Sequence, residues 1–162
     1  MVEINQRYAL EKRIKELYDA HTERAKLIDW NYYDYLPWEK GRSFKENPWE
    51  ESQRTLPIEI VTAIETSMLT EINLPWYTAY IKDMFKGGLE PMQKFLNNWT
   101  AEEDQHASAL ENYLILTRNS NPKELGALKK EMILTGWDGT FANPIATMGY
   151  TAIQELATVV FY

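Results

Sequence analysis

The 162-residue chain contains no cysteine. This absence excludes disulfide bonds, thiolate nucleophiles and iron–sulfur clusters held by cysteine. If the protein carries out chemistry with single electrons, those electrons must therefore come from a partner or from a bound metal ion.

Long apolar runs are also missing. No stretch approaches the roughly 18 apolar residues that span a bilayer, and residues 1–7 lack the apolar core of a signal peptide. We therefore expect a soluble, cytoplasmic protein with no membrane span. With 44% hydrophobic residues, including six Trp and ten Tyr, the chain is long enough to bury a sizeable core, and we expect residues 1–162 to form one domain.

Positive charge is scarce as well. The chain carries 17 Lys and Arg against 24 Asp and Glu, a formal net charge of −7. This balance argues against nucleic acid as a partner, because a phosphate backbone requires a basic surface. The imbalance is uneven: residues 1–45 hold nine basic and eight acidic side chains, whereas the remainder holds eight and sixteen. An acidic partner would therefore approach the N-terminal third more easily.

Apolar residues recur at spacings of three and four through most of the chain, which predicts an all-α fold. The aromatic segment around Pro37 is expected to be extended over the core, and the charged stretch after it to be an exposed connection. The last predicted helix is apolar nearly all round, which is typical of a buried helix. The expected helices cover about residues 5–26, 57–86, 91–118, 123–136 and 143–162.

Carboxylates occur where these helices should be apolar. Glu71 continues the apolar stripe of the second predicted helix, and Pro75 removes the N–H that would bond the Glu71 carbonyl, so this helix should kink or loosen there. Glu155 is the only charged residue of the last helix. On the third helix, Glu103 precedes His106 by three residues, so both side chains project to the same side. A buried carboxylate must be protonated, paired or bound to a metal.

Several interpretations of these residues remain open. Helical Glu-x-x-His pairs often lie on solvated surface, and buried carboxylates can form ordinary ion pairs. Ferritin-like di-iron bundles, however, take a lone Glu from each of two helices and a Glu-x-x-His from each of two others. Glu71, Glu103 with His106, and Glu155 fit that scheme with one Glu-x-x-His missing. This oxygen-rich set suits two divalent irons better than a single zinc. The other histidine, His21, lies among charged residues and is expected at the surface.

Three segments carry a resemblance to a known family. The sequence is similar to the soluble acyl-acyl-carrier-protein desaturases, the ferritin-like family that includes plant stearoyl desaturases. Residues 69–77 (Leu-Thr-Glu-Ile-Asn-Leu-Pro-Trp-Tyr) resemble the family's Thr-Glu-Glu-Ala-Leu-Pro-Thr-Tyr. Residues 99–106 (Trp-Thr-Ala-Glu-Glu-Asp-Gln-His) resemble Trp-Thr-Ala-Glu-Glu-Asn-Arg-His, and residues 150–158 (Tyr-Thr-Ala-Ile-Gln-Glu-Leu-Ala-Thr) resemble Tyr-Thr-Ser-Phe-Gln-Glu-Arg-Ala-Thr.

The resemblance implies a ferritin-like helical bundle and an enzyme. Its reaction would insert a cis double bond into a fatty acyl chain held on acyl carrier protein, with two Fe as a di-iron centre, O2 as co-substrate and a ferredoxin-type electron donor. The family is dimeric, so a homodimer is expected. The resemblance implies the iron ligands Glu71, Glu103, His106 and Glu155.

The resemblance also implies roles beyond the metal. Thr158 matches a threonine implicated in oxygen activation and proton delivery, and Trp30 and Trp99 match tryptophans near the route between surface and site. Where plant members carry Gly-Phe at the acyl cavity, this chain has Thr147-Met148. The residues expected to line the substrate channel are Tyr80, Met84, Thr147 and Met148.

One departure is large. The family has a further helix with a second Glu-x-x-His, and this chain ends before it, so we expect the N-terminal part of a longer domain. Two alternatives follow: another ferritin-like di-iron oxidase, or a metal-free, inactive helical fragment whose carboxylates pair with one another. An acidic carrier protein could dock on the N-terminal third, through Arg13, Arg24 and Lys26.

Overall fold

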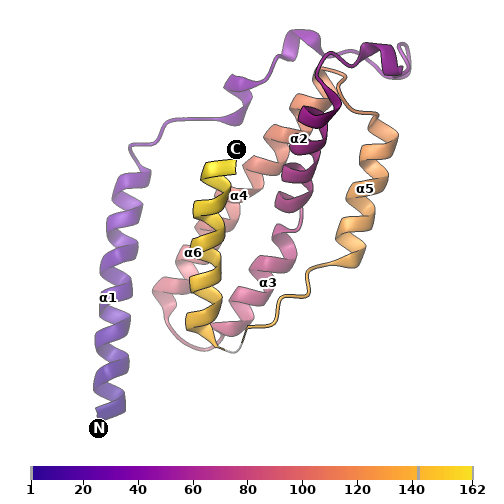
Figure 1. The fold of residues 1–162 in the computed structure, drawn as a ribbon. Coiled ribbons are helices and arrows are strands. Elements are labelled where there is room, and N and C mark those ends of the chain that lie inside the picture. The colour runs from indigo at the N-terminus through magenta and orange to yellow at the C-terminus, as the bar shows by residue number, and fades with distance from the viewer. Residues whose placement is uncertain (1, 142, 162) are drawn as a thin grey trace. The chain divides into compact units, whose positions relative to one another are not determined.

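The computed structural model describes residues 2–141 and 143–161 (Figure 1), and it describes side chains from Arg7 onward. Within these ranges the chain forms helices and loops without a β-strand, so the all-α prediction is confirmed. The long helices are α1 (Val2–Ala25), α2 (Ile58–Glu71), α3 (Leu74–Met84), α4 (Glu90–Leu116), α5 (Pro122–Thr135) and α6 (Pro144–Phe161). Three single-turn 3-10 helices precede α2: η1 (Tyr32–Tyr35), η2 (Trp38–Lys40) and η3 (Glu51–Gln53).

The internal contacts divide the chain into two compact units. Unit 1 contains Met1–Trp30, Tyr77–Ala101 and Gly139–Tyr162, and unit 2 contains Asn31–Trp76 and Glu102–Asp138. Helices α3 and α4 contribute one end to each unit. The expectation of one domain over residues 1–162 stays a prediction.

Unit 2 is built around an apolar core shared by α2, α4 and α5. Its centre consists of four residues that are almost fully buried: Val61, Met68, Leu114 and Leu125. Burying one such side chain stabilises the fold by roughly 1.5–3 kcal/mol. Partly buried residues of the same helices and the preceding loop surround them: Leu56, Ile64, Leu69, Leu110 and Ile115. This core fixes α2 against the C-terminal half of α4.

The connection from α4 to α5 is closed by backbone and side-chain hydrogen bonds. At the end of α4, the Asn119 N–H donates to the Leu114 carbonyl (3.0 Å) and the Arg118 N–H to the Ile115 carbonyl (3.2 Å), a Schellman pattern with Arg118 at a φ of 58°. The Asn121 side chain then caps α5, with Pro122 in its first turn.

Unit 1 brings α1 and α6 against the other ends of α3 and α4. The Asn98 side chain of α4 donates to the Tyr18 hydroxyl of α1 at 3.0 Å, and the His21 ring packs edge-on against Phe95 with the ring centroids 5.5 Å apart. His21 is therefore half-buried, and its Nε2 is buried without a hydrogen-bond partner. The prediction of a surface histidine was wrong, because the apolar face of α1 that carries His21 packs on α4.

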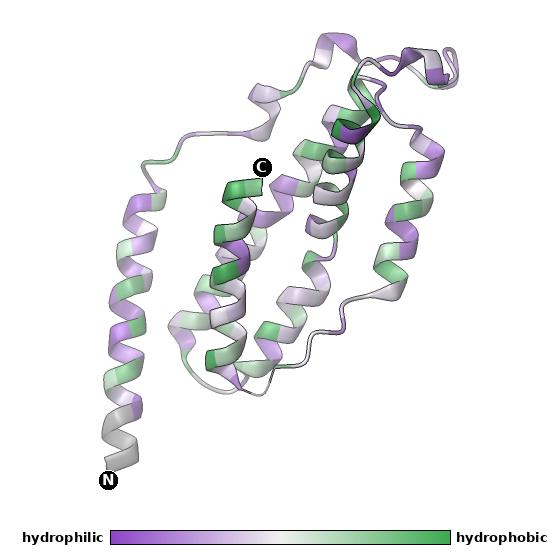
Figure 2. Cartoon of the chain, viewed as in Figure 1, coloured by the Kyte–Doolittle hydropathy of each residue, from purple (hydrophilic) through white to green (hydrophobic). Residues whose placement is uncertain are grey.

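The structure tests three sequence predictions about the elements. The interruption predicted at Glu71 is confirmed: the helix expected over residues 57–86 is two helices, α2 and α3, because Pro75 cannot supply the N–H that would bond the Glu71 carbonyl. The other two predictions were wrong. The segment expected to be extended contains η1 and η2 and is mostly exposed. The last helix is not buried: Thr147 is its only buried residue, and Val160 is 82% exposed. Figure 2 shows hydrophobic residues along much of α6.

Candidate metal centre

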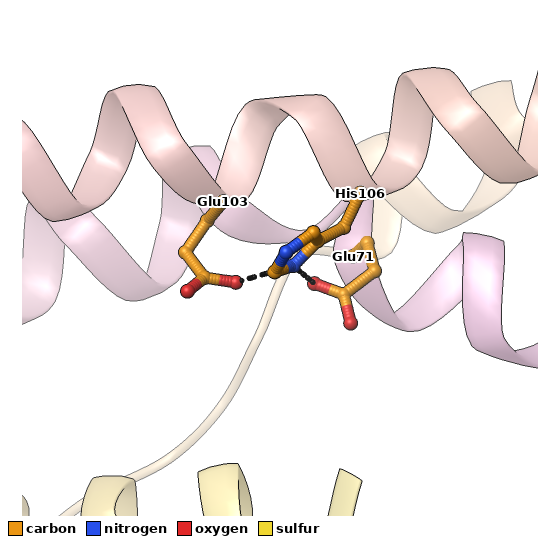
Figure 3. Close-up of side chains that lie close together, drawn as sticks. All are labelled: Glu71, Glu103 and His106. Carbon is orange, nitrogen blue, oxygen red and sulfur yellow. Dashed lines mark ion pairs between the residues drawn. The ribbon is translucent and has the colours of Figure 1, made fainter. Parts of the chain in front are cut away.

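Two helices of unit 2 supply the candidate site. Glu71 is the last residue of α2, directly before the break that leads to α3, and Glu103 and His106 lie three residues apart on α4. Because helical residues three apart share a face, Glu103 and His106 project together toward Glu71 (Figure 3). The Glu103–His106 pair that the sequence predicts therefore lies close to Glu71, one of the two predicted lone carboxylates.

The imidazole of His106 presents its Nδ1 atom to both carboxylates. Nδ1 lies 2.8 Å from Glu103 Oε2 and 4.0 Å from Glu71 Oε2 (Figure 3). One ligand atom from each residue lies within 4.8 Å of the other two. The side chains of Glu71 and Glu103 are 12% and 11% exposed, whereas that of His106 is 38% exposed. The two carboxylates are thus largely withdrawn from water, and the imidazole lies toward solvent.

Apolar packing on either side of the three residues holds them together. Met68, one turn before Glu71, and Leu110, one turn after His106, both belong to the core cluster of unit 2. The hydrophobic contact therefore supplies the free energy that keeps two carboxylates near one another, an arrangement that is costly without a compensating positive charge. Two carboxylate ligands and one imidazole suit a divalent cation such as iron, manganese or zinc, so the donor set fits a metal.

The other residues proposed for the centre lie in unit 1. Glu155 and Thr158 are half-buried on α6, and the Thr158 hydroxyl donates to the Glu155 carbonyl oxygen at 2.8 Å. Trp99 is half-buried on α4, one turn before Glu103, and Trp30, which follows α1, is 39% exposed. The roles of these four residues stay predictions.

The four residues predicted to line a substrate channel lie on α3 and α6 within unit 1. Thr147 is buried, and its hydroxyl donates to the Met84 sulfur at 3.8 Å. The Tyr80 hydroxyl accepts from the Phe141 N–H at 2.9 Å. Met84 and Met148 line an open groove of about 1010 Å³. Their role in binding a substrate stays a prediction.

Sequence reasoning missed the contribution of α1 to this groove. Leu10 and Ile14 of α1 and Leu89 and Met92 near the start of α4 line it beside the two methionines, so its walls are mainly apolar. The spacing of Leu10 and Ile14 on one helical face was the signal that could have found them.

No sequence pattern marks Tyr32, which in unit 2 interacts with α4 next to the cluster. A hydrogen bond with the Tyr33 side chain, desolvation and the negative charge of Asp104 raise the pKa of Tyr32 above its ordinary value, and a hydrogen bond with Ser108 opposes this shift. Asp104 and Ser108 flank the turn of α4 that carries His106, so η1 lies beside the helix that supplies two of the candidate ligands.

A profile described as fatty acid desaturase matches residues 2–162. The chain belongs to this family. The family resemblance that the three sequence segments carry is thereby confirmed. Across residues 2–141 and 143–161, none of the helices combines the length and the hydropathy needed to cross a bilayer.

Relatives of this desaturase-family chain are found in bacteria and plants. DesA1 of Mycobacterium tuberculosis, provisionally named an acyl-[acyl-carrier-protein] desaturase, is 32% identical over 162 residues, covering 93% of this chain and 47% of DesA1. A chloroplastic stearoyl-[acyl-carrier-protein] 9-desaturase of Arabidopsis thaliana is 31% identical over 141 residues, covering 81% of this chain and 35% of that protein. The solved structure of DesA2 from Mycobacterium tuberculosis is 24% identical, with a TM-score of 0.48, and the match covers 80% of this chain and 47% of that one. The chain spans about half the length of the mycobacterial relatives.

Proposed function

We propose that this chain acts in an acyl-[acyl-carrier-protein] desaturase, an oxidoreductase that inserts a cis double bond into a carrier-bound fatty acyl chain during fatty acid biosynthesis. The observation that carries the proposal is the Glu71–Glu103–His106 cluster in a chain of the fatty acid desaturase family. Relatives that are 31–32% identical are named for the same carrier-bound substrate class, which supports it.

The reaction requires an oxidant stronger than any side chain, because a saturated methylene has no acidic proton. It would convert an acyl CH2–CH2 unit, O2, two electrons and two protons into a CH=CH unit and two water molecules. Two bound irons would supply the activation of O2. Glu71, Glu103 and His106 would hold iron, and we propose Glu155 of α6 as a fourth ligand. The electrons would come from a ferredoxin-type donor, since the chain has no cysteine for a cluster of its own.

The residues of the chain would position the substrate and deliver protons. In this proposal Tyr80, Met84, Thr147 and Met148 line the acyl channel and keep water from the reacting carbons. The Thr158 hydroxyl, which donates to the Glu155 carbonyl in the structure, would have to leave that carbonyl to deliver a proton at the centre. Trp30 and Trp99 would lie on the route between surface and site.

The expected partners and compartment belong to the same proposal: acyl carrier protein, an electron donor, a second copy of the chain in a homodimer, and the cytoplasm. The three cations proposed for docking of the carrier protein each have a local partner in the structure. Arg13 pairs with Glu16 at 3.1 Å, Lys26 pairs with Glu23 at 2.6 Å, and Arg24 donates to the Ala20 carbonyl. Local partners thus already neutralise two of these charges.

Iron binding tests the centre. The purified chain, reconstituted anaerobically with Fe2+, should retain iron, and the Glu103→Ala and His106→Ala variants should lose it. Glu102→Ala is the matched control, because Glu102 is an exposed neighbour on the same helix. Retention below about a tenth of an iron per chain, or equal binding by all four proteins, would contradict the ligand assignment.

Turnover tests the reaction. The iron-loaded chain, incubated with O2, reduced ferredoxin and palmitoyl- or stearoyl-carrier protein, should give a monoene that mass spectrometry detects. Iron binding without a monoene would favour another di-iron oxidase of the same fold. A chain that neither binds iron nor turns over would be a metal-free helical fragment.

A further inference from the structure

Arg118 of unit 2 is a buried cation with only neutral partners. It is 7% exposed. Its Nε donates to the Gln53 side-chain oxygen at 2.9 Å, and its Nη2 donates to the carbonyls of Asn47 (2.6 Å) and Pro48 (3.0 Å). The guanidinium carbon lies 4.4 Å from the centroid of the Phe44 ring. Within the described residues no carboxylate pairs with Arg118, although burying a charge is costly unless an opposite charge compensates it.

The guanidinium also retains unused hydrogen-bonding capacity. Its Nη1 is buried and has no hydrogen-bond partner. The Arg118 backbone has a φ of 58°, a left-handed conformation that is uncommon for residues other than glycine. Such a conformation persists where surrounding contacts hold it, as the bonds of Trp49 Nε1 to the Arg118 carbonyl and of Arg118 itself to the loop do here. The charge is thus fixed in place.

A pocket of about 390 Å³ adjoins this charge. Lys40 and Arg42 line it together with Arg118, and Glu39 is its only acidic lining residue. Neither Lys40 nor Arg42 forms an ion pair in the part of the chain that the structure describes. The pocket therefore carries a formal charge of +2 in a chain whose net charge is −7. The amides of Asn47 and Gln53 also line the pocket and add neutral hydrogen-bonding groups.

We propose that this basic pocket of unit 2 binds a phosphate-type oxyanion, either free phosphate or the phosphate group of a larger metabolite. A dianion matches the formal charge of the pocket, and its several oxygens can accept from ammonium, guanidinium and amide donors at once. Arg118 Nη1 has no solvent contact, so Lys40 and Arg42 provide the direct contacts with the anion. The buried charge of Arg118 attracts the anion from the protein side of the pocket, where water and salt screen that charge poorly. The site is independent of the metal cluster and of the proposed desaturation.

Phosphate titration followed by NMR tests the pocket on the intact, metal-free chain. Inorganic phosphate, added at constant ionic strength, should shift the amide signals of residues 40–53 and 116–119 along saturating curves. The Lys40→Gln/Arg42→Gln double variant should weaken the affinity at least about tenfold. Lys45→Gln is the matched control, because it removes one charge from the same loop at an exposed position outside the pocket.

Each remaining outcome decides the proposal. Linear, unsaturated shifts, or equal weakening by Lys45→Gln, would mean that phosphate acts only through general charge screening and would overturn it. If acetate, a monoanion, binds as tightly as phosphate, the proposal that the ligand is a dianion is overturned. Titration with glycerol 3-phosphate, a phosphate ester, distinguishes the two sources of phosphate. If the ester binds more tightly than inorganic phosphate, the site is assigned to a phosphate ester; if it binds more weakly, the site is assigned to free phosphate. Because no metal or O2 is present, failure here leaves the desaturase proposal untouched.

Discussion

Replacing Glu71 with Gln should stabilise the metal-free protein and weaken its response to metal. The carboxylates of Glu71 and Glu103 approach within 4.8 Å. At an effective dielectric constant of about 20, two unit charges at that distance repel each other by about 3.5 kcal/mol. His106 Nδ1 lies 2.8 Å from Glu103 Oε2 and 4.0 Å from Glu71 Oε2, so its close contact with Glu103 remains after the substitution. Residual solvent contact and the imidazole reduce the gain to about 1–2 kcal/mol.

Thermal unfolding measures both halves of this prediction. For a chain of this size, 1 kcal/mol corresponds to about 2–4 °C, so metal-free Glu71→Gln should melt about 2–8 °C above the parent. Fe2+ at about one hundred times its dissociation constant should stabilise the parent by about 2.7 kcal/mol. The variant should gain much less, because an amide replaces one of the charged ligands.

A control separates the local effect from the net charge of the chain. Glu102→Gln removes the same charge from an exposed position on α4, and it should shift the melting temperature by no more than about 1–2 °C. The reasoning is refuted if Glu71→Gln destabilises the metal-free chain, or if Fe2+ raises the melting temperature of parent and variant equally.

Three further predictions concern unit 2. Leu114→Ala should lower the free energy of unfolding by about 3 kcal/mol in urea titrations, while Leu134→Ala, at a position 74% exposed, should change it little. Asn119→Ala should cost about 2 kcal/mol, because the Asn119 side-chain oxygen accepts from the N–H groups of Thr55 and Leu56. The raised pKa of Tyr32 means that the folded state holds its proton more tightly, so stability should fall as the pH rises past 10, and Tyr32→Phe should flatten that decline in alkaline unfolding curves.

Much of the fold was predictable because helices α1, α4 and α5 are amphipathic, and α5 carries clear end signals. Asn121 and Pro122 start α5, and Gly136, at a φ of 72°, ends it. The Glu103–His106 pair was equally predictable, since residue spacing alone places both side chains on one side of a helix. Their meeting with Glu71 was expected because Glu71 continues the apolar stripe of α2, although that stripe did not fix every residue of the face that packs on α4.

The exact packing face was harder to predict. Two adjacent apolar residues of α2 differ in burial: Ile60 is exposed, whereas Val61 is fully buried in the core. A shift of one residue turns a helix face by about 100°, and the pattern of α2 allows either choice because both residues are apolar. Long-range contacts with α4 and α5 decide between them, and these contacts have no counterpart in local sequence.

Arg118 shows the same limit at the level of function. In the sequence it was one more charged residue near a helix end, where a cation favours the helix dipole. Only the fold brings residues 39–53 around it, seventy positions earlier in the chain, and turns a terminal arginine into a buried charge beside Lys40 and Arg42. The Glu71–Glu103–His106 cluster and the basic pocket lie in one unit and carry opposite charges: the first gathers carboxylates, which favours a cation, and the second gathers cations, which favours an anion. Each proposal therefore predicts that its ligand stabilises the folded chain, and ligand-linked stability is a measurement that tests both.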